Sequence, residues 1–119
     1  MFISIDQEGG MVTRIFNGST FFPGAMTISA TNNVENAYEM GQIMGKELNA
    51  LGVNMNLAPV LDVNNNPHNP VIGVRSFSDK PEVVSEYGWA SAKGLQEQSV
   101  FATAKHFPGH GDTNVDSHL

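Results

Sequence analysis

Short apolar runs alternate along this chain with longer stretches in which apolar residues recur every three or four positions. The short runs predict buried β-strands. They lie at residues 2–5, 53–61 and 100–104. The longer stretches have the spacing of amphipathic helices and cover residues 34–51 and 81–95. Gly52 is expected to end the first helix, and Pro81 suits the first position of the second.

The predicted elements follow one another as β-α-β-α-β, which is typical of an α/β fold with a parallel sheet. Polar residues cluster just after each predicted strand, at residues 6–14, 62–75 and 105–118. In a (β/α)8 TIM barrel and in a doubly wound sheet alike, this is the carboxyl end of the sheet, where sites are built. A whole barrel needs about 250 residues. Three strands and two helices therefore predict a partial barrel, a fragment of one domain that is incomplete at both ends.

Composition and charge exclude several classes of function. The net charge is −6, and the six basic residues are scattered, so neither a nucleic-acid footprint nor binding to an acidic membrane surface is expected. The chain has no cysteine, which excludes disulfides and thiolate metal sites. Its sequence shows no apolar run of the roughly 20 residues that a membrane span requires.

The segment at residues 105–118 holds three of the four histidines and two of the five aspartates. A solvated surface loop is one interpretation. The alternative is a functional loop, because Pro108, Gly109 and Gly111 indicate a tightly turned backbone that holds its side chains in place.

Two kinds of chemistry are open to this loop. His106 and His110 stand four apart, the spacing of a zinc pair on a helix, but the proline and glycine between them argue against a helix. Asp116 and His118 stand two apart. The carboxylate would accept a hydrogen bond from one ring nitrogen, set the tautomer and direct the other nitrogen to a substrate oxygen.

Two further residues have both an ordinary and a functional interpretation. Asp6 follows the first predicted strand, where a carboxylate either binds vicinal hydroxyls of a sugar or caps the loop. Arg75 follows a long loop rich in Asn and Pro and is either a surface residue or a ligand clamp.

Taken together, four segments resemble the family 3 glycoside hydrolases, specifically the bacterial β-N-acetylglucosaminidases that act on peptidoglycan fragments. The first three are Asp-Gln-Glu-Gly-Gly at 6–10, Asn-Leu-Ala-Pro-Val-Leu-Asp-Val at 56–63 and Arg-Ser-Phe at 75–77. The fourth and most specific is Lys-His-Phe-Pro-Gly-His-Gly-Asp-Thr at 105–113, with Asp-Ser-His at 116–118. The match covers nearly the whole chain in the right order.

The resemblance implies a (β/α)8 barrel and retaining hydrolysis of a terminal β-linked N-acetylglucosamine, with a carbohydrate as partner and no metal or other cofactor. It implies His118 as acid/base and Asp116 as its dyad partner. The implied sugar ligands are Asp6, Arg14, Arg75, Lys105 and His106. A histidine in this role is unusual, because most glycosidases use two carboxylic acids. Our hypothesis is that an uncharged imidazole avoids repelling a negatively charged intermediate or substrate.

The chain departs from the family pattern in two respects. Met11 stands where the family commonly has Arg after the Gly-Gly pair. The nucleophilic Asp of the family lies on a later strand, so no aspartate of this chain is expected in that role. Asp62 and Asp112 are interpreted as residues that fix loops, and the 119-residue chain is expected to show no normal hydrolytic turnover.

Three other functions stay open at this point. A β-glucosidase of the same family is the nearest, although such enzymes usually lack the Asp-Ser-His element. A glycoside phosphorylase is the second, since members with an Asp-His dyad use phosphate in place of water. The third is a non-catalytic sugar-binding remnant.

Overall fold

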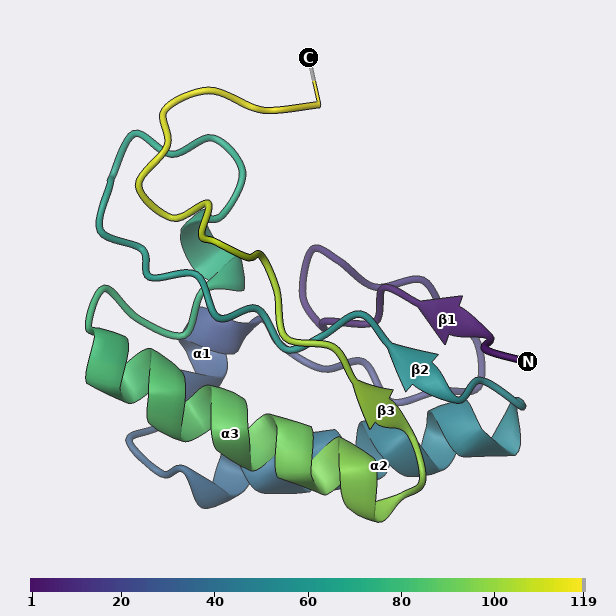
Figure 1. Cartoon of the computed structure of the whole chain (residues 1–119). Helices are drawn as coiled ribbons and strands as arrows, with labels where there is room; N and C mark the ends of the chain where they lie inside the picture. Colours follow the sequence, from purple (N-terminus) through teal and green to yellow (C-terminus); the bar gives the residue numbers. More distant parts are fainter. Residues whose placement is uncertain (119) are drawn as a thin grey trace.

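The structure, a computed structural model, describes residues 1–118 and places three parallel strands side by side (Figure 1). The strands are β1 (Ser4–Ile5), β2 (Met55–Asn56) and β3 (Phe101–Ala102), in the order β1-β2-β3. Ser4 pairs with Met55, which pairs in turn with Phe101. Two long helices, α2 (Glu35–Ala50) and α3 (Pro81–Glu97), connect successive strands and pack together against one face of the sheet (Figure 1).

The predicted order of strands and long helices is confirmed, and the differences lie in length and in two short helices. Each hydrogen-bonded strand has two residues, fewer than the apolar runs suggested. The helices α1 (Ala25–Ser29) and η1 (Gly73–Arg75) lie in segments without a predicted element. One turn of helix is too short for apolar residues to repeat, so periodicity gives no signal for it.

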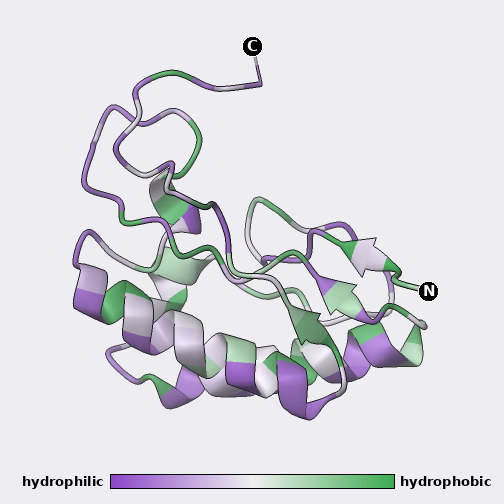
Figure 2. Cartoon of the chain, in the orientation of Figure 1, coloured by the Kyte–Doolittle hydropathy of each residue, from purple (hydrophilic) through white to green (hydrophobic). Residues whose placement is uncertain are grey.

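The core lies between the sheet and the two long helices. Its buried apolar side chains come mostly from α2 and α3, and the hydropathy colouring shows polar residues on the outer sides of these helices (Figure 2). The core comprises Phe22, Ile28, Ala37, Met40, Met44, Leu48, Phe77, Val84, Tyr87, Ala90, Leu95 and Val100. Leu51, the last residue of the first predicted helix, lies just after α2 and is 61% exposed.

Glycines let α2 and α3 approach closely. A Cβ on Gly94 would lie 2.3 Å from the Tyr38 carbonyl oxygen, and one on Gly41 would lie 2.3 Å from that of Ser91. Larger side chains at either position would push the helices apart.

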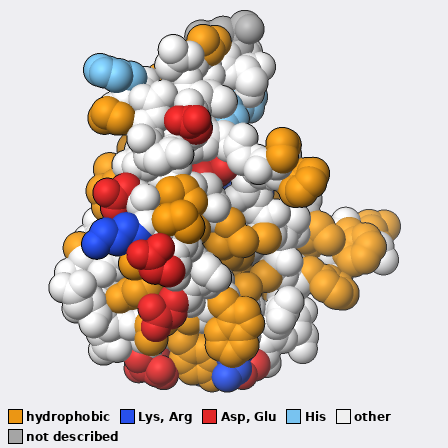
Figure 3. All heavy atoms as spheres, turned by 60° about the vertical axis from the view of Figure 1, so that its left-hand side comes forward, with side chains coloured by type: hydrophobic (Ala, Val, Ile, Leu, Met, Phe, Trp, Pro, Cys, Tyr) orange, Lys and Arg blue, Asp and Glu red, His pale blue; other side chains and the backbone are white. Residues whose placement is uncertain are grey.

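The segments that leave the carboxyl ends of the strands gather at one end of the molecule. Val60 and Lys105 form a further parallel bridge beyond β2 and β3. The fully buried Asn56 accepts a hydrogen bond from the Gln7 N–H at 3.0 Å and donates one to the Gln7 carbonyl at 2.8 Å. The segment from 105 onward then runs beside the loop that follows β2, and histidine side chains are visible at this end (Figures 1 and 3). No helix among residues 1–118 has the length and apolarity of a membrane span.

Candidate functional site

Four charged side chains from three segments meet at the carboxyl ends of the strands. Glu8 accepts two hydrogen bonds from the Arg75 guanidinium, from Nε at 3.0 Å and from Nη2 at 2.8 Å. The Lys105 ammonium lies 2.6 Å from Glu8 Oε1 and 2.8 Å from Asp6 Oδ1. Asp6 and Glu8 follow β1, Arg75 belongs to η1 and Lys105 follows β3, so this cluster joins the ends of three chain segments.

Glu8 is the centre of this cluster. Its side chain is 7% exposed, against 17% for Arg75 and 14% for Lys105. Burial raises the pKa of the Glu8 carboxyl, but the hydrogen bonds from Arg75 and Lys105 outweigh it and hold the pKa below its ordinary value. The hydrogen bond from Lys105 likewise lowers the pKa of Asp6, and Glu8 raises the pKa of Arg75. Asp6, Glu8 and Arg75 are therefore charged at neutral pH.

The loop after β2 positions Arg75. The side chain of Asn69 accepts hydrogen bonds from the N–H groups of Val71 and Ile72, both at 2.8 Å, and so fixes the backbone ahead of η1. Arg75 Nη1 donates to the Val71 carbonyl at 3.2 Å. Asn69 acts here as a turn residue through its side-chain oxygen, a common use of Asn in loops.

The same loop also holds the segment after β3. The Asn69 side-chain amide donates to the His110 carbonyl at 2.6 Å, and that of Asn66 donates to the Asp112 and Thr113 carbonyls, both at 3.2 Å. Gly111 is buried against the loop, and a Cβ there would lie 1.8 Å from the Val63 carbonyl oxygen. The predicted fixed backbone of this segment thus depends on a glycine for space and on two asparagines for hydrogen bonds.

Asp62 is a buried carboxylate beneath this segment. Its Oδ2 lies 2.5 Å from His106 Nδ1, and its Oδ1 accepts the His110 N–H at 2.6 Å. The interpretation of Asp62 as a loop-fixing residue agrees with these contacts. Asp112, to which we gave the same role, is exposed, and its backbone carbonyl makes the contact with Asn66.

Asp116 and His118 form the predicted carboxylate–imidazole pair. Asp116 Oδ1 lies 2.7 Å from His118 Nδ1 and accepts the His118 N–H at 2.9 Å. The backbone N–H and then the imidazole of His118 lower the pKa of Asp116. The His118 side chain is 79% exposed, so its second ring nitrogen is open to a ligand or to another segment.

The structure brings some of the predicted site residues together and leaves others apart. Asp6, Arg75 and Lys105 share one cluster through Glu8. Arg14 is exposed, and its positive charge contributes to lowering the pKa of Asp6. Within residues 1–118, no hydrogen bond or ion pair links the cluster to His106 or His118.

Both histidines of the suggested zinc pair use Nδ1 in a contact with another side chain. His106 Nδ1 contacts Asp62, and His110 Nδ1 contacts the Thr113 hydroxyl at 2.7 Å. The part of the chain that the structure describes holds no group of three or more His, Asp or Glu side chains with the geometry of a metal site.

Glu8 was not among the predicted site residues. It lies inside the Asp-Gln-Glu-Gly-Gly motif, two positions after Asp6, so in an extended segment both side chains point to the same side. That spacing is the signal that could have identified it.

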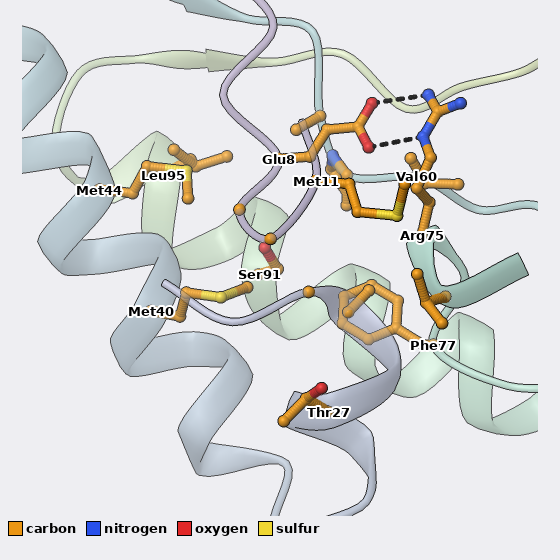
Figure 4. Close-up of a pocket in the computed structure, with 17 residues that line it drawn as sticks. Glu8, Met11, Thr27, Met40, Met44, Val60, Arg75, Phe77, Ser91 and Leu95 are labelled. Atoms are coloured by element: carbon orange, nitrogen blue, oxygen red, sulfur yellow. Dashed lines mark hydrogen bonds and ion pairs between the residues drawn. The ribbon is translucent and has the colours of Figure 1, made fainter. Parts of the chain in front are cut away.

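A cavity of about 220 Å³ lies directly behind the ion pair (Figure 4). Glu8 and Arg75 contribute to its wall on one side, while Met40 and Met44 of α2 and Leu95 of α3 lie on the other (Figure 4). The cluster therefore stands between this apolar interior and the loops at the carboxyl ends of the strands.

Comparison with known proteins agrees with the motifs and the geometry. Residues 1–119 match the model of the glycosyl hydrolase family 3 N-terminal domain. Beta-hexosaminidase A of Pseudoalteromonas piscicida is 52% identical over 99% of this chain, which spans 20% of that protein. A family 3 β-N-acetylglucosaminidase from a Paenibacillus strain superposes with a TM-score of 0.97 at 58% identity, covering 99% of this chain and 22% of the other.

A second solved structure is NagZ from Neisseria gonorrhoeae in complex with N-trifluoroacetyl-D-glucosamine. It superposes with a TM-score of 0.89 at 36% identity, over 99% of this chain and 37% of that one. The chain thus spans between 20% and 37% of the length of these three relatives. The predicted fold, part of a (β/α)8 barrel, is confirmed.

Proposed function

Because this chain belongs to glycosyl hydrolase family 3, whose N-terminal domain it matches throughout, we propose that the protein is a retaining β-N-acetylglucosaminidase. Its proposed substrate is a terminal β-linked N-acetylglucosamine on peptidoglycan fragments or related glycans. Relatives called beta-hexosaminidase and β-N-acetylglucosaminidase support this at 52% and 58% identity. The observation that carries the proposal is the cluster around Glu8, which gathers charged hydrogen-bonding groups where barrel enzymes build their sites.

We also propose that the chain forms one part of a single barrel domain in a longer parent protein. The three parallel strands of residues 1–118 form an open sheet, whereas a closed barrel has eight strands. The experiments below therefore use the parent protein.

The proposed ligands of the sugar lie on the three loops described above. Asp6 presents a carboxylate that accepts hydrogen bonds from hydroxyls, and Lys105 holds it in place at 2.8 Å. Donors come from the two other loops, with Arg14 as a further contact beside Asp6. His106 is a further proposed ligand, and the proposed donors are Arg75 and Lys105. Charged groups of this kind make hydrogen bonds about twice as strong as neutral pairs do, which suits the recognition of a polyhydroxyl ring.

His118 is the proposed acid/base. Asp116 accepts a hydrogen bond from Nδ1–H, so Nε2 is left to face the reacting oxygen, as a donor in the imidazolium and as an acceptor in the neutral imidazole. In the first half of a retaining reaction the imidazolium gives its proton to the leaving oxygen, and in the second half the imidazole takes one from water. Because the pair is exposed, it becomes effective once the substrate or a neighbouring segment excludes water around it.

We assign the nucleophile to none of the five aspartates of this chain. Asp6 is paired with Lys105, Asp62 is buried beneath His106, and Asp116 is engaged with His118. Asp79 and Asp112 are exposed on the surface.

The test is hydrolysis of aryl β-N-acetylglucosaminide beside aryl β-glucoside by the parent protein, with His118→Ala in parallel. We expect the aminosugar to be preferred and His118→Ala to lower kcat by about 100- to 10,000-fold, the usual contribution of general acid–base catalysis. Preference for the glucoside would indicate a β-glucosidase, and a rate that depends on phosphate would indicate a phosphorylase. Sugar binding without turnover would indicate a non-catalytic sugar-binding protein.

A further inference from the structure

The roles proposed so far leave Asp62 with no function beyond holding a loop, yet its contacts go further. Its carboxylate follows β2, is completely buried and uses both oxygens. One oxygen accepts the His110 N–H at 2.6 Å, and the other lies 2.5 Å from His106 Nδ1. Since a carboxylate is an acceptor, His106 must carry a proton on Nδ1 to make this hydrogen bond.

We propose that Asp62 is a positioning residue that holds His106 with its proton on Nδ1, so that Nε2 is presented to a hydroxyl of the sugar. This proposal rests on the proposed function, in which His106 is a ligand of the sugar. In the neutral ring, Nε2 is then an acceptor with a fixed direction. Among the described residues Nε2 has no hydrogen-bond partner.

The surroundings of His106 are consistent with an open second nitrogen. The His106 side chain is 34% exposed while its partner Asp62 has no exposed surface. Together with the proposed sugar ligand Lys105, His106 lines a surface hollow of about 220 Å³. The imidazole is therefore held by Asp62 on one ring nitrogen and partly accessible to a ligand.

A loop anchor alone would need one acceptor, the oxygen that binds the His110 N–H. The contact of the second oxygen with His106 leads to a prediction about the protonation of the imidazole, which a purely structural role would not affect. In Asp62→Asn, the amide oxygen must keep facing the His110 N–H, because a backbone N–H cannot give up its proton. The amide N–H then faces His106 Nδ1, and two donors meet there unless the imidazole moves its proton to Nε2. The substitution thus forces the opposite tautomer.

The experiment is long-range ¹H–¹⁵N NMR of ¹⁵N-histidine-labelled parent protein without substrate, at a pH about two units above the ordinary histidine pKa of about 6.5. His106 is assigned by its absence in His106→Gln. In the unmodified protein we expect Nδ1 to have the shift of a protonated ring nitrogen and Nε2 that of an unprotonated one. In Asp62→Asn we expect the two to exchange, and kcat/KM to fall by about 10- to 100-fold, as for partners that orient a functional imidazole elsewhere.

Asp79→Asn is the matched control, since it makes the same change at an exposed carboxylate close to the start of α3. It should leave both the His106 shifts and kcat/KM unchanged. A His106 protonated on Nε2 in the unmodified protein, or an unaltered tautomer in Asp62→Asn, would overturn the proposal. If Asp62→Asn does not fold, the spectrum of the unmodified protein decides alone. Absence of glycosidase activity in a protein with the expected tautomers would overturn the proposed function instead.

Discussion

Replacing Glu8 by Gln is the most informative perturbation of the charged cluster. The substitution keeps the volume and one acceptor oxygen, but it removes the negative charge that faces two cations. Glu8 makes three short contacts, at 3.0 and 2.8 Å to Arg75 and at 2.6 Å to Lys105, with a side chain that is 7% exposed. Removing one member of a buried ion pair costs about 3–5 kcal/mol, because the remaining charge stays buried without compensation. The retained acceptor and the partner Asp6 of Lys105 place the expected loss near the lower end, about 3 kcal/mol.

Urea denaturation of the unmodified parent protein and of its Glu8→Gln variant measures this loss of stability. For a slope of about 2 kcal/mol per M, the expected loss lowers the midpoint by about 1.5 M. The control is Glu97→Gln, which removes a charge from the exposed pair of Lys93 and Glu97, with side chains 48% and 40% exposed. Such surface pairs contribute about 0–1 kcal/mol. Equal midpoints for the two variants would refute the view that burial makes the Glu8 network strong.

The original protein and the Glu8→Gln variant also give a pH dependence with a defined sign. The folded-state pKa of Glu8 lies below its ordinary value of 4.5, because the hydrogen bonds from Arg75 and Lys105 outweigh burial. A group with a lowered pKa stabilises the fold above its unfolded-state pKa and loses this contribution as the pH falls through the folded-state value. The difference in stability between the original protein and Glu8→Gln should therefore be full at neutral pH and shrink on acidification below about 4.5. A difference that grows on acidification would contradict this assignment.

Three further predictions concern the dyad, the helix interface and the isolated chain. Asp116→Asn should lower kcat of the parent protein, because the substitution removes the carboxylate that orients His118. Since the pKa of Asp116 lies below its ordinary value of 3.8, Asp116 is ionised above that pH, and an acid limb of the pH–rate profile above about 5 must belong to another group. Gly94→Ala should destabilise the protein by about 1–3 kcal/mol in thermal or urea unfolding, since its Cβ would meet the Tyr38 carbonyl at 2.3 Å, whereas Ser85→Ala on the exposed side of α3 should not. The 119-residue chain alone should release no N-acetylglucosamine from an aryl glycoside, because each of its aspartates is either engaged elsewhere or on the surface, and measurable release would contradict that placement.

The sequence predicted the long elements well because burial repeats along them. The helix from Pro81 and the helix ending before Gly52 have the expected apolar spacing, and both are present at nearly the predicted bounds. The short elements η1 and α1 had no such repeat. η1 follows a local turn in which the Asn69 side chain accepts hydrogen bonds from the Val71 and Ile72 N–H groups, and α1 is held by a tertiary contact in which the Ser29 hydroxyl donates to the Phe77 carbonyl.

The location of the candidate site could be predicted from the sequence, but the pairing of its carboxylates with its cations could not. Parallel strands bring their carboxyl ends to one edge, so the order of elements alone predicts that the segments after the strands lie at the same end of the sheet. Which carboxylate faces which cation depends on register and on loop paths, across separations of 67 residues for Glu8 and Arg75 and 99 for Asp6 and Lys105. Asp6 and Glu8 both point toward these cations, yet Glu8 takes the buried position and Asp6 the more open one, with side chains 7% and 38% exposed. This difference separates their roles, since the buried carboxylate is fully used in holding Arg75 and Lys105, while the open one keeps an oxygen for a ligand.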